Sequence, residues 1–391
     1  MKKINVGIVG SGLMCQLHSE AYSLMPMMFA SDLKYMPVKK VLCDVTEELA
    51  KKGAEKYGWE EYVVGVENLL ARDDIDMIDI VAPNRFHKEI AIAAAKAGKN
   101  IYCEKPLGLS AEECLEMCKA AEEAGVRTAV GFNKRRWPAV VYAKQLIDRG
   151  EIGEVLYYRG TYQQSDSLNA DLPFSWRYDA KRAGYGVVTD IGSHVIDQCR
   201  YLMGEFDEVI GMRRIHIKER PMMADQNAAY SRDLMVNAGT KEMAKVTTDD
   251  TAVFMAKMKN GGMSLFDVSR CASGQGDGAG FEVWGSKGAI RWNMQYDSEL
   301  QVSLESNPAD KHGFITIQMG PQHPYGQALW CVPGFGTGLA DNKALEIHDV
   351  IESFAEGKEF HSDFRDGLKC CQVVDSIVKS EETNGWVKIP E

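Results

Sequence analysis

The sequence predicts an α/β protein with two parts: an N-terminal doubly wound parallel sheet, and a C-terminal α/β domain with an open, mainly antiparallel sheet. The chain has 391 residues, more than one hydrophobic core usually accommodates, so two domains are expected. Its first third alternates short apolar runs with amphipathic helical patterns, which is the rhythm of βαβ units. After Gly131 this rhythm ends, and from residue 206 the pattern becomes strand, turn, strand. We place the domains at residues 1–132 and 133–391.

In the first domain, strands are expected at runs rich in Val and Ile, as in strands covered on both faces. These runs are residues 4–9, 38–43, 77–81, 100–103 and 128–131. Helical periodicity fills the gaps, for example over residues 88–97 and 111–124. The second of these helices opens with Ser110-Ala111-Glu112-Glu113, a capping box in which the Ser110 and Glu113 side chains satisfy free amides.

In the second domain, helices are expected over residues 138–148 and from the Asp190 region to residue 203, with a strand at 155–163 between them. Strands joined by turns are expected over 206–217 and 251–292, with Lys259-Asn260-Gly261-Gly262 and Gly285-Ser286-Lys287-Gly288 as turn signals. Residues 218–248 show little periodicity, and we expect a long insertion or lid there.

Composition narrows the class of partner. With 45% hydrophobic and 26% charged residues, the chain has the make-up of an ordinary globular enzyme. A net charge of -11 opposes binding to nucleic acid or to an anionic membrane, so a small neutral substrate fits better. No apolar stretch approaches the roughly 20 residues of a membrane span, and the apolar run at 4–9 is too short for a signal peptide. We expect a cytoplasmic protein whose ten cysteines are reduced.

A glycine-rich turn follows the first strand. Gly10-Ser11-Gly12-Leu13-Met14-Cys15 has the context of a dinucleotide fingerprint, with Cys15 as a small residue in place of the third glycine. Asp44, at the end of the second strand, could accept hydrogen bonds from the ribose diol and repel a 2'-phosphate, which predicts NAD as the cofactor. The alternative is that Asp44 is only a helix N-cap. The long spacing from Gly12 to Asp44 is attributed to a loop at residues 25–37.

Taken with further motifs, the chain resembles the family of glucose–fructose oxidoreductase, inositol dehydrogenase and rhizopine catabolism protein (Gfo/Idh/MocA) over nearly its whole length. The motifs are Gly10-x-Gly12, Asp44, Ala82-Pro83-Asn84-Arg85-Phe86-His87, Ala95-x-Ala97-Gly98-Lys99, Glu104-Lys105-Pro106, Gly131-Phe132-Asn133 with Arg135 and Arg136, and Asp190-x-Gly192-x-His194-x-x-Asp197. The resemblance implies a Rossmann domain, a substrate between the domains, and a homo-oligomer, dimer or tetramer, formed through the C-terminal sheet. It implies NAD contacts from Gly10, Gly12, Leu13, Met14, Asp44, Ala82, Pro83, Asn84, His87, Glu104 and Lys105.

The chemistry of alcohol oxidation points to three catalytic residues. NAD accepts a hydride, and a base must accept the hydroxyl proton. Lys105 follows a strand at the carboxyl edge of the sheet, where ligands bind, and the positive nicotinamide would favour its neutral form. The alternative is that Lys105 only pairs with Glu104 at the surface. Asp190 and His194 are spaced i, i+4, so within one helix they share a face: His194 could exchange a proton with a substrate hydroxyl while Asp190 orients it.

Other residues allow more than one interpretation. Asp197 could join the site or form a salt bridge. Zinc binding by Asp190, His194 and Asp197 is disfavoured because no further ligand cluster is evident, and no metal is expected. Besides Lys105, Asp190 and His194, the expected substrate contacts are Asn133, Trp176 and Arg177. Asn133 could instead hold an interdomain hinge, and Trp176 could belong to the core. Arg136, Arg270 and the loop 333–338 are weaker candidates.

These features predict an NAD-dependent oxidoreductase that oxidises a secondary ring hydroxyl of a sugar or glycoside, with C3 of a glucoside as the first candidate. Phosphorylated substrates are disfavoured because the predicted site has few cationic side chains available to bind a phosphate, chiefly Arg177 and Arg136. An inositol 2-dehydrogenase is the nearest alternative. An NAD-dependent glycosidase acting by transient oxidation and elimination is an alternative of another class. A non-catalytic NAD sensor would have no need for the lysine, aspartate and histidine together.

Overall fold

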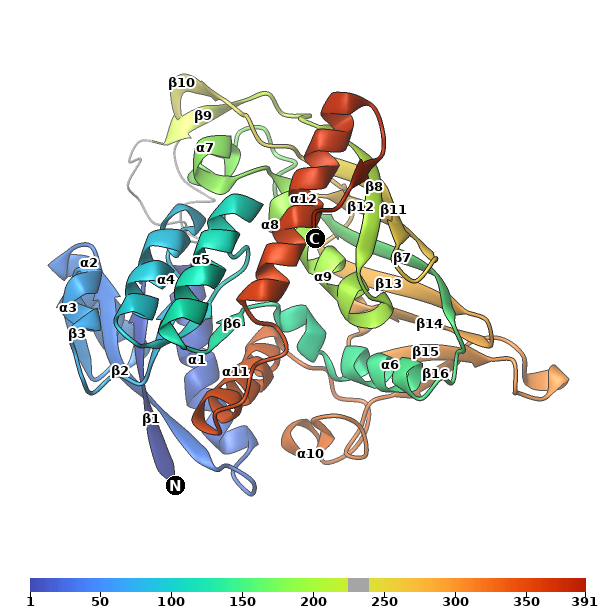
Figure 1. Cartoon of the computed structure of the whole chain (residues 1–391), viewed down its shortest axis with the longest axis horizontal. Helices are drawn as coiled ribbons and strands as arrows, with labels where there is room; N and C mark the ends of the chain where they lie inside the picture. The colour runs from blue at the N-terminus through green and yellow to red at the C-terminus, as the bar shows by residue number, and fades with distance from the viewer. Residues whose placement is uncertain (224–238) are drawn as a thin grey trace. The chain divides into compact units, whose positions relative to one another are not determined.

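The computed structural model describes residues 1–223 and 239–391, which form two compact units (Figure 1). The first unit contains residues 1–133 and 338–371. The described part of the second contains residues 134–223, 239–337 and 372–391. Residues 338–371, expected from the sequence in the second domain, therefore belong to the first unit.

The first unit is built on a six-stranded parallel sheet of order β3-β2-β1-β4-β5-β6, which confirms the doubly wound fold predicted from the βαβ rhythm. Its strands are β1 (Lys2–Val9), β2 (Tyr35–Asp44), β3 (Glu61–Val64), β4 (Met77–Ile80), β5 (Asn100–Cys103) and β6 (Thr128–Val130). The strand order reverses direction between β1 and β4. In folds of this kind, ligands bind at the carboxyl ends of the strands near that switch point.

Helices of the first unit pack around this sheet. They are α1 (Leu13–Met28), α2 (Glu47–Tyr57), α3 (Val66–Leu70), α4 (His87–Lys96), α5 (Ala111–Ala124) and α11 (Leu339–Ala355). The serine half of the predicted capping box of α5 is confirmed, since Ser110 Oγ accepts from the Glu113 N–H at 3.2 Å. The Glu113 side chain instead accepts from the N–H of Leu109, one residue before the cap, at 2.9 Å. Helix α11 packs on α1, and its buried face, including Ile347, Val350 and Ile351, joins the core of the unit.

The loop predicted at residues 25–37 is shorter than expected. Helix α1 runs to Met28 with Pro26 inside it, and β2 already begins at Tyr35. Burial of Tyr22 and Met25 in the core holds the last turns of α1, and Tyr35 pairs in register with Lys2. The long spacing between Gly12 and Asp44 therefore comes from a sixteen-residue helix and a ten-residue strand.

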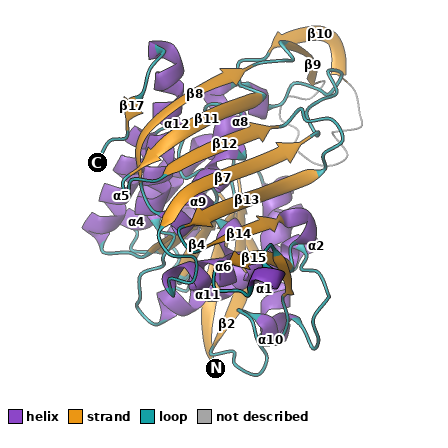
Figure 2. Ribbon diagram, turned by 90° about the vertical axis from the view of Figure 1, so that its right-hand side faces the viewer, coloured by secondary structure: helices purple, strands orange, loops and turns teal. Residues whose placement is uncertain are grey.

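The second unit contains a nine-stranded sheet of order β16-β15-β14-β13-β7-β12-β11-β8-β17. Its strands are β7 (Val155–Gln164), β8 (Phe206–Arg214), β11 (Thr251–Met258), β12 (Met263–Ser269), β13 (Asp277–Gly285), β14 (Gly288–Asn293), β15 (Glu299–Leu304), β16 (Ile315–Gln318) and β17 (Val387–Lys388). Only the pairing of β12 with β7 is parallel among these described strands, so the mainly antiparallel prediction is confirmed, as are both turn signals. Figure 2 shows the strands side by side, with α8 and α9 behind them.

Helices of the second unit are α6 (Pro138–Asp148), α7 (Ala180–Ala183), α8 (Val187–Asp190), α9 (Gly192–Met203) and α10 (Gly326–Leu329), while α12 (Phe364–Thr383) has residues in both units. The ends of the expected insertion form an antiparallel ribbon of β9 (Glu219–Met223) and β10 (Gly239–Lys245). The rest of that insertion, residues 224–238, lies outside the described residues.

All ten cysteines are described and are free thiols. Within the described ranges, no helix is both long and apolar enough to cross a membrane.

Candidate functional site

The glycine-rich turn brings two segments of the first unit together. Gly10 has φ +106°, and a Cβ there would lie 3.1 Å from both the N and the Cα of Ala82, so a glycine is needed for this close approach. A Cβ at Gly12, the N-cap of α1, would meet no described heavy atom within 4 Å. Leu13 and Met14 form the first turn of α1. Open space before free amides at a helix N-terminus fits a dinucleotide pyrophosphate.

Asp44 is the last residue of β2, at the same edge of the sheet as this turn. The Gly10 N–H donates to the carbonyl of the preceding Cys43 at 2.9 Å. The N-cap of α2 is Thr46, whose Oγ1 accepts from the Leu49 N–H at 3.3 Å, whereas Asp44 Oδ1 accepts from the Val45 N–H at 2.6 Å. The helix-cap interpretation of Asp44 is therefore wrong, and its contact with the ribose stays a prediction.

The Ala82–His87 segment follows β4. Pro83 is exposed and Ala82 and Asn84 are half-buried, with Asn84 opening the short helix η1 (Asn84–Phe86). His87 is buried, and its Nδ1 and Nε2 lie 3.0 and 2.9 Å from the carbonyl oxygens of Pro106 and Ala82. Burial lowers the pKa of His87. Both ring nitrogens thus face the main chain, so we assign His87 to positioning the Ala82 and Pro106 segments.

Glu104 and Lys105 directly follow β5. The Glu104 side chain turns into the protein, where Oε1 lies 2.9 Å from His18 Nε2 and 2.6 Å from Lys343 Nζ. Its other oxygen accepts from the Lys105 backbone N–H at 3.1 Å. Burial alone would raise the pKa of Glu104, but the Lys343 charge and the His18 hydrogen bond outweigh burial and lower it. Since Glu104 is only 5% exposed, a surface salt bridge does not describe this pair. Lys105 itself is half-buried.

In the second unit, Asp190 and His194 belong to two helices rather than to the single helix predicted. Helix α8 ends at Asp190 and α9 begins at Gly192, with Ile191 between them. The His194 N–H donates to the Ile191 carbonyl at 3.2 Å, a short i, i+3 bond, and Ser193 Oγ donates to the Asp190 carbonyl at 3.1 Å. His194 is buried and Asp190 is half-buried.

Tyr162, which neighbours His194, and Lys134, which lies next to Tyr162, were not found from the sequence. The ring centroid of Tyr162, on β7, lies 6.0 Å from that of His194, and the buried Lys134 places its ammonium 5.2 Å from the Tyr162 centroid. Burial raises the pKa of Tyr162, and nearby Asp277 and Asp190 add to this effect. Lys134 directly follows the Gly131-Phe132-Asn133 motif, so its position in the sequence could have identified it as a candidate site residue. Tyr162 lies within a strand pattern that gives no hint of its neighbour.

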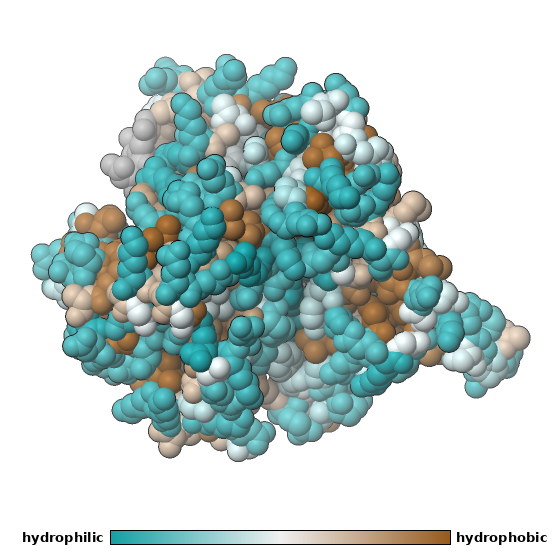
Figure 3. Space-filling view, viewed as in Figure 1, coloured by the Kyte–Doolittle hydropathy of each residue, from teal (hydrophilic) through white to brown (hydrophobic). Residues whose placement is uncertain are grey.

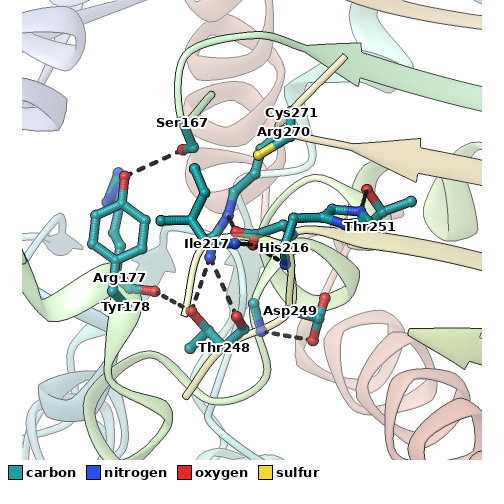
Figure 4. A network of polar contacts seen from close by, with 12 residues as sticks. Ser167, Arg177, Tyr178, His216, Ile217, Thr248, Asp249, Thr251, Arg270 and Cys271 are labelled. Atoms are coloured by element: carbon teal, nitrogen blue, oxygen red, sulfur yellow. Dashed lines mark hydrogen bonds and ion pairs between the residues drawn. The ribbon is translucent and has the colours of Figure 1, made fainter. Parts of the chain in front are cut away.

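Trp176 and Arg177 lie in the short helix η3 (Trp176–Tyr178). Trp176 is half-buried, so it does not belong to the core, and the Arg177 guanidinium lies 4.6 Å from its ring centroid. The Arg177 carbonyl accepts from Thr248 Oγ1 at 3.1 Å, and Arg270 donates to the same Thr248 hydroxyl at 3.0 Å (Figure 4). Arg270 also pairs with Asp250 at 2.9 Å and is buried. Arg270 therefore stabilises the position of η3 through Thr248.

Asn133 and Asp197 have protein partners. Asn133 Nδ2 donates to Asn342 Oδ1 of α11 at 2.8 Å, within the first unit. The Asp197 carboxylate accepts from Arg135 at 2.8 and 2.6 Å, which confirms its salt-bridge interpretation. In the described part of the chain, no group of three or more His, Cys, Asp or Glu side chains could hold a metal ion.

Comparisons with known proteins agree with both halves of this description. Residues 4–132 match the oxidoreductase family with an NAD-binding Rossmann fold, and residues 140–291 match the Gfo/Idh/MocA C-terminal domain. Levoglucosan dehydrogenase of Pseudarthrobacter phenanthrenivorans is 39% identical over 391 residues, covering 100% of this chain and 99% of that protein. A solved structure of levoglucosan dehydrogenase in complex with NADH and levoglucosan matches with a TM-score of 0.93 at 38% identity, over the full length of both chains.

Two further relatives act on other ring compounds. Inositol 2-dehydrogenase of Rhizobium meliloti is 26% identical over 96% of both chains. Glucose-6-phosphate 3-dehydrogenase of Bacillus subtilis is 29% identical over 75% of both. Since the two domain models together match most of the chain and a relative matches its full length, the protein belongs to the Gfo/Idh/MocA family of NAD-binding oxidoreductases.

Proposed function

We propose that this protein is an NAD-dependent sugar dehydrogenase that oxidises a secondary ring hydroxyl, with C3 of a glucoside or an anhydroglucose as the first candidate. The observation that carries the proposal is the full-length similarity to levoglucosan dehydrogenase, whose substrate is an anhydrosugar. The position of the hydroxyl is supported by the similarity to a glucose-6-phosphate 3-dehydrogenase.

In this proposal, bound NAD supplies the hydride acceptor. Lys105 and His194 move the hydroxyl proton, and Asp190 orients the sugar by accepting a hydrogen bond. Glu104 is an unsuitable base because its carboxylate is already held by Lys343 and His18. Trp176, with Arg177 beside it, offers an apolar face of the kind that packs against a sugar ring.

Inositol oxidation is the second candidate, favoured by the similarity to inositol 2-dehydrogenase over 96% of the chain. An inositol ring also presents secondary hydroxyls to a base and a hydride acceptor. The same lysine, aspartate and histidine would serve both rings.

The test is to mix the purified protein with NAD and follow nicotinamide absorbance with levoglucosan, methyl glucosides, myo-inositol and scyllo-inositol. We expect NAD to be reduced in the presence of levoglucosan or a glucoside. Carbon NMR of the oxidised sugar should place the ketone at C3. Reduction with inositols alone would favour the second candidate. Release of the aglycone from a glucoside without net NADH would indicate a glycosidase, and no reaction with any of these compounds would contradict the proposal.

We also propose that a second copy of the chain packs on the open face of the nine-stranded sheet. Along β11, buried residues alternate with Val253 and Met255, which are exposed, and Met212 of β8 pairs directly with Val253. Exposed apolar residues on one sheet face favour association. Figure 3 shows apolar residues at the surface over β13 and β14 of this sheet, and hydrophilic residues over α4 and α5. Light scattering of wild type and Met255→Lys would test this, since a monomeric wild type contradicts it.

A further inference from the structure

A buried cluster of charged side chains lies behind Lys105 in the first unit. Glu104, the residue before Lys105, is its centre. The cluster includes Lys343 and Glu346 of α11, which are each 1% exposed, and His18 of α1, which is fully buried. Lys343 and Glu104 are 239 residues apart in the chain. A C-terminal helix thus reaches the main chain that carries the proposed catalytic lysine.

Lys343 has three acceptors for its three protons. Its Nζ lies 2.6 Å from Glu104 Oε1, 2.7 Å from Glu346 Oε2 and 3.1 Å from the Tyr102 hydroxyl, which in turn donates to Glu346. Burial alone would lower the pKa of Lys343, but the charges of Glu104 and Glu346 raise it. Lys343 is therefore a fixed cation and cannot accept a proton in the reaction.

The cation determines the state of Glu104. A buried carboxylate that lacks a counter-charge becomes protonated or moves toward water, because an unpaired buried charge is costly. With Lys343 in place Glu104 stays ionised, and it accepts the Lys105 backbone N–H at 3.1 Å. Hydrogen bonds to ionised acceptors are about twice as strong as neutral ones. The main chain at Lys105 is thereby tied to a carboxylate that Lys343 and His18 hold in place.

We propose that Lys343 is a positioning residue for Lys105: it fixes the Glu104 carboxylate, and through it the main chain from which the Lys105 side chain projects. The inference rests on the proposed function, in which Lys105 moves the hydroxyl proton. It explains why α11 carries a buried lysine at all. Ile347, Val350 and Ile351 already attach this helix to the core, and buried ion pairs seldom add net stability over apolar residues of similar size.

Three variants test the inference. Lys343→Met removes the cation, and a shift of the base by about 1 Å should lower kcat about 10- to 100-fold while the Kd for NAD changes little. Lys343→Arg keeps the charge and should recover part of that loss. Glu104→Met combined with Lys343→Met removes the Glu104–Lys343 ion pair but leaves the buried Glu346 without its cation. The double variant should therefore melt below the wild type but above Lys343→Met. Its kcat should stay low because the Lys105 N–H has lost its acceptor.

The matched control is Lys34→Met. Lys34 also pairs with α11, through Glu352 and Glu356, but at the surface, and its loss should leave kcat unchanged. If the double variant has the wild-type kcat, Lys343 is only structural and the inference is overturned. If Lys343→Met does not fold, the kcat values of the double variant and of Lys343→Arg still test the inference.

Lys105→Ala, measured in parallel, separates this inference from the proposed function. Full turnover in Lys105→Ala overturns the proposed function itself. Loss of turnover in Lys105→Ala, together with wild-type kcat in Lys343→Met, overturns only the positioning role.

Discussion

Arg135 donates two parallel hydrogen bonds to Asp197, from Nε to Oδ2 at 2.8 Å and from Nη2 to Oδ1 at 2.6 Å. Both side chains are buried in the second unit. Such bidentate pairs combine charge with a fixed geometry. Because Asp197 lies on α9, one turn after His194, the pair also fixes the helix that carries the histidine.

Breaking this pair should be costly. Arg135→Ala leaves a buried carboxylate without its partner, and we expect a loss of about 3–5 kcal/mol in the free energy of unfolding. Urea denaturation would measure it. Lys144→Ala breaks the surface pair with Asp148 on α6 and should cost less than about 1 kcal/mol. Equal losses in the two variants would show that the Arg135 pair is no stronger than a surface pair.

Cofactor choice should depend on Asp44. If the Asp44 carboxylate binds the ribose diol and repels a 2'-phosphate, kcat/KM should be higher with NAD than with NADP, and Asp44→Ala should narrow that difference. Comparing kcat/KM for the two cofactors tests this. Thr46→Ala is the control: it removes the cap of α2, at about 1 kcal/mol of stability, and should leave the preference unchanged. A wild-type preference for NADP would refute the assignment.

Proton transfer should be shared by Lys105 and His194. If they act as one unit, each alanine variant should lower turnover about 10²-fold or more, and the double variant should lose much less than the product of the two. Once either residue is gone, the relay is already broken. Fully multiplicative losses would mean that the residues act independently. Loss of NAD binding in His194→Ala would place the histidine with the cofactor instead.

Stability should depend on pH through His18. Its Nδ1 lies 2.8 Å from Asp79 Oδ2 and its Nε2 2.9 Å from Glu104 Oε1, so the imidazolium form satisfies both carboxylates. Burial alone would lower the pKa of His18, but the Asp79 charge and the two hydrogen bonds raise it. A raised folded-state pKa stabilises the protein below the unfolded value of about 6.5.

This stabilisation should fade as pH rises through the folded-state pKa of His18. The difference in unfolding free energy between wild type and His18→Gln should therefore be largest in acid and shrink toward alkaline pH. His312→Gln, at an exposed histidine, is the control. A difference that grows with pH would mean that His18 is neutral in the folded protein.

Local patterns predicted local features well. The bounds of α6 and the cap of α5 were visible because a helix start and an apolar face are encoded within a few residues. The break at Ile191 was not predicted, because residues spaced i, i+4 look the same in the sequence whether they lie in one helix or on either side of a one-residue break. Lys343 could not be found, since a lysine in an amphipathic helix normally faces solvent, and its partner lies 239 residues away.

The place of α11 in the first unit also bears on how the chain is made. The six strands of the parallel sheet leave the ribosome early, but the helix that covers α1 and supplies Lys343 follows only after residue 337. At about 5–20 residues per second, this delay is on the order of 10–40 s. During synthesis, the apolar face of α1 that α11 later covers is therefore open to chaperones, and Glu104 lacks its cation. The first unit is complete only when residue 371 has been made.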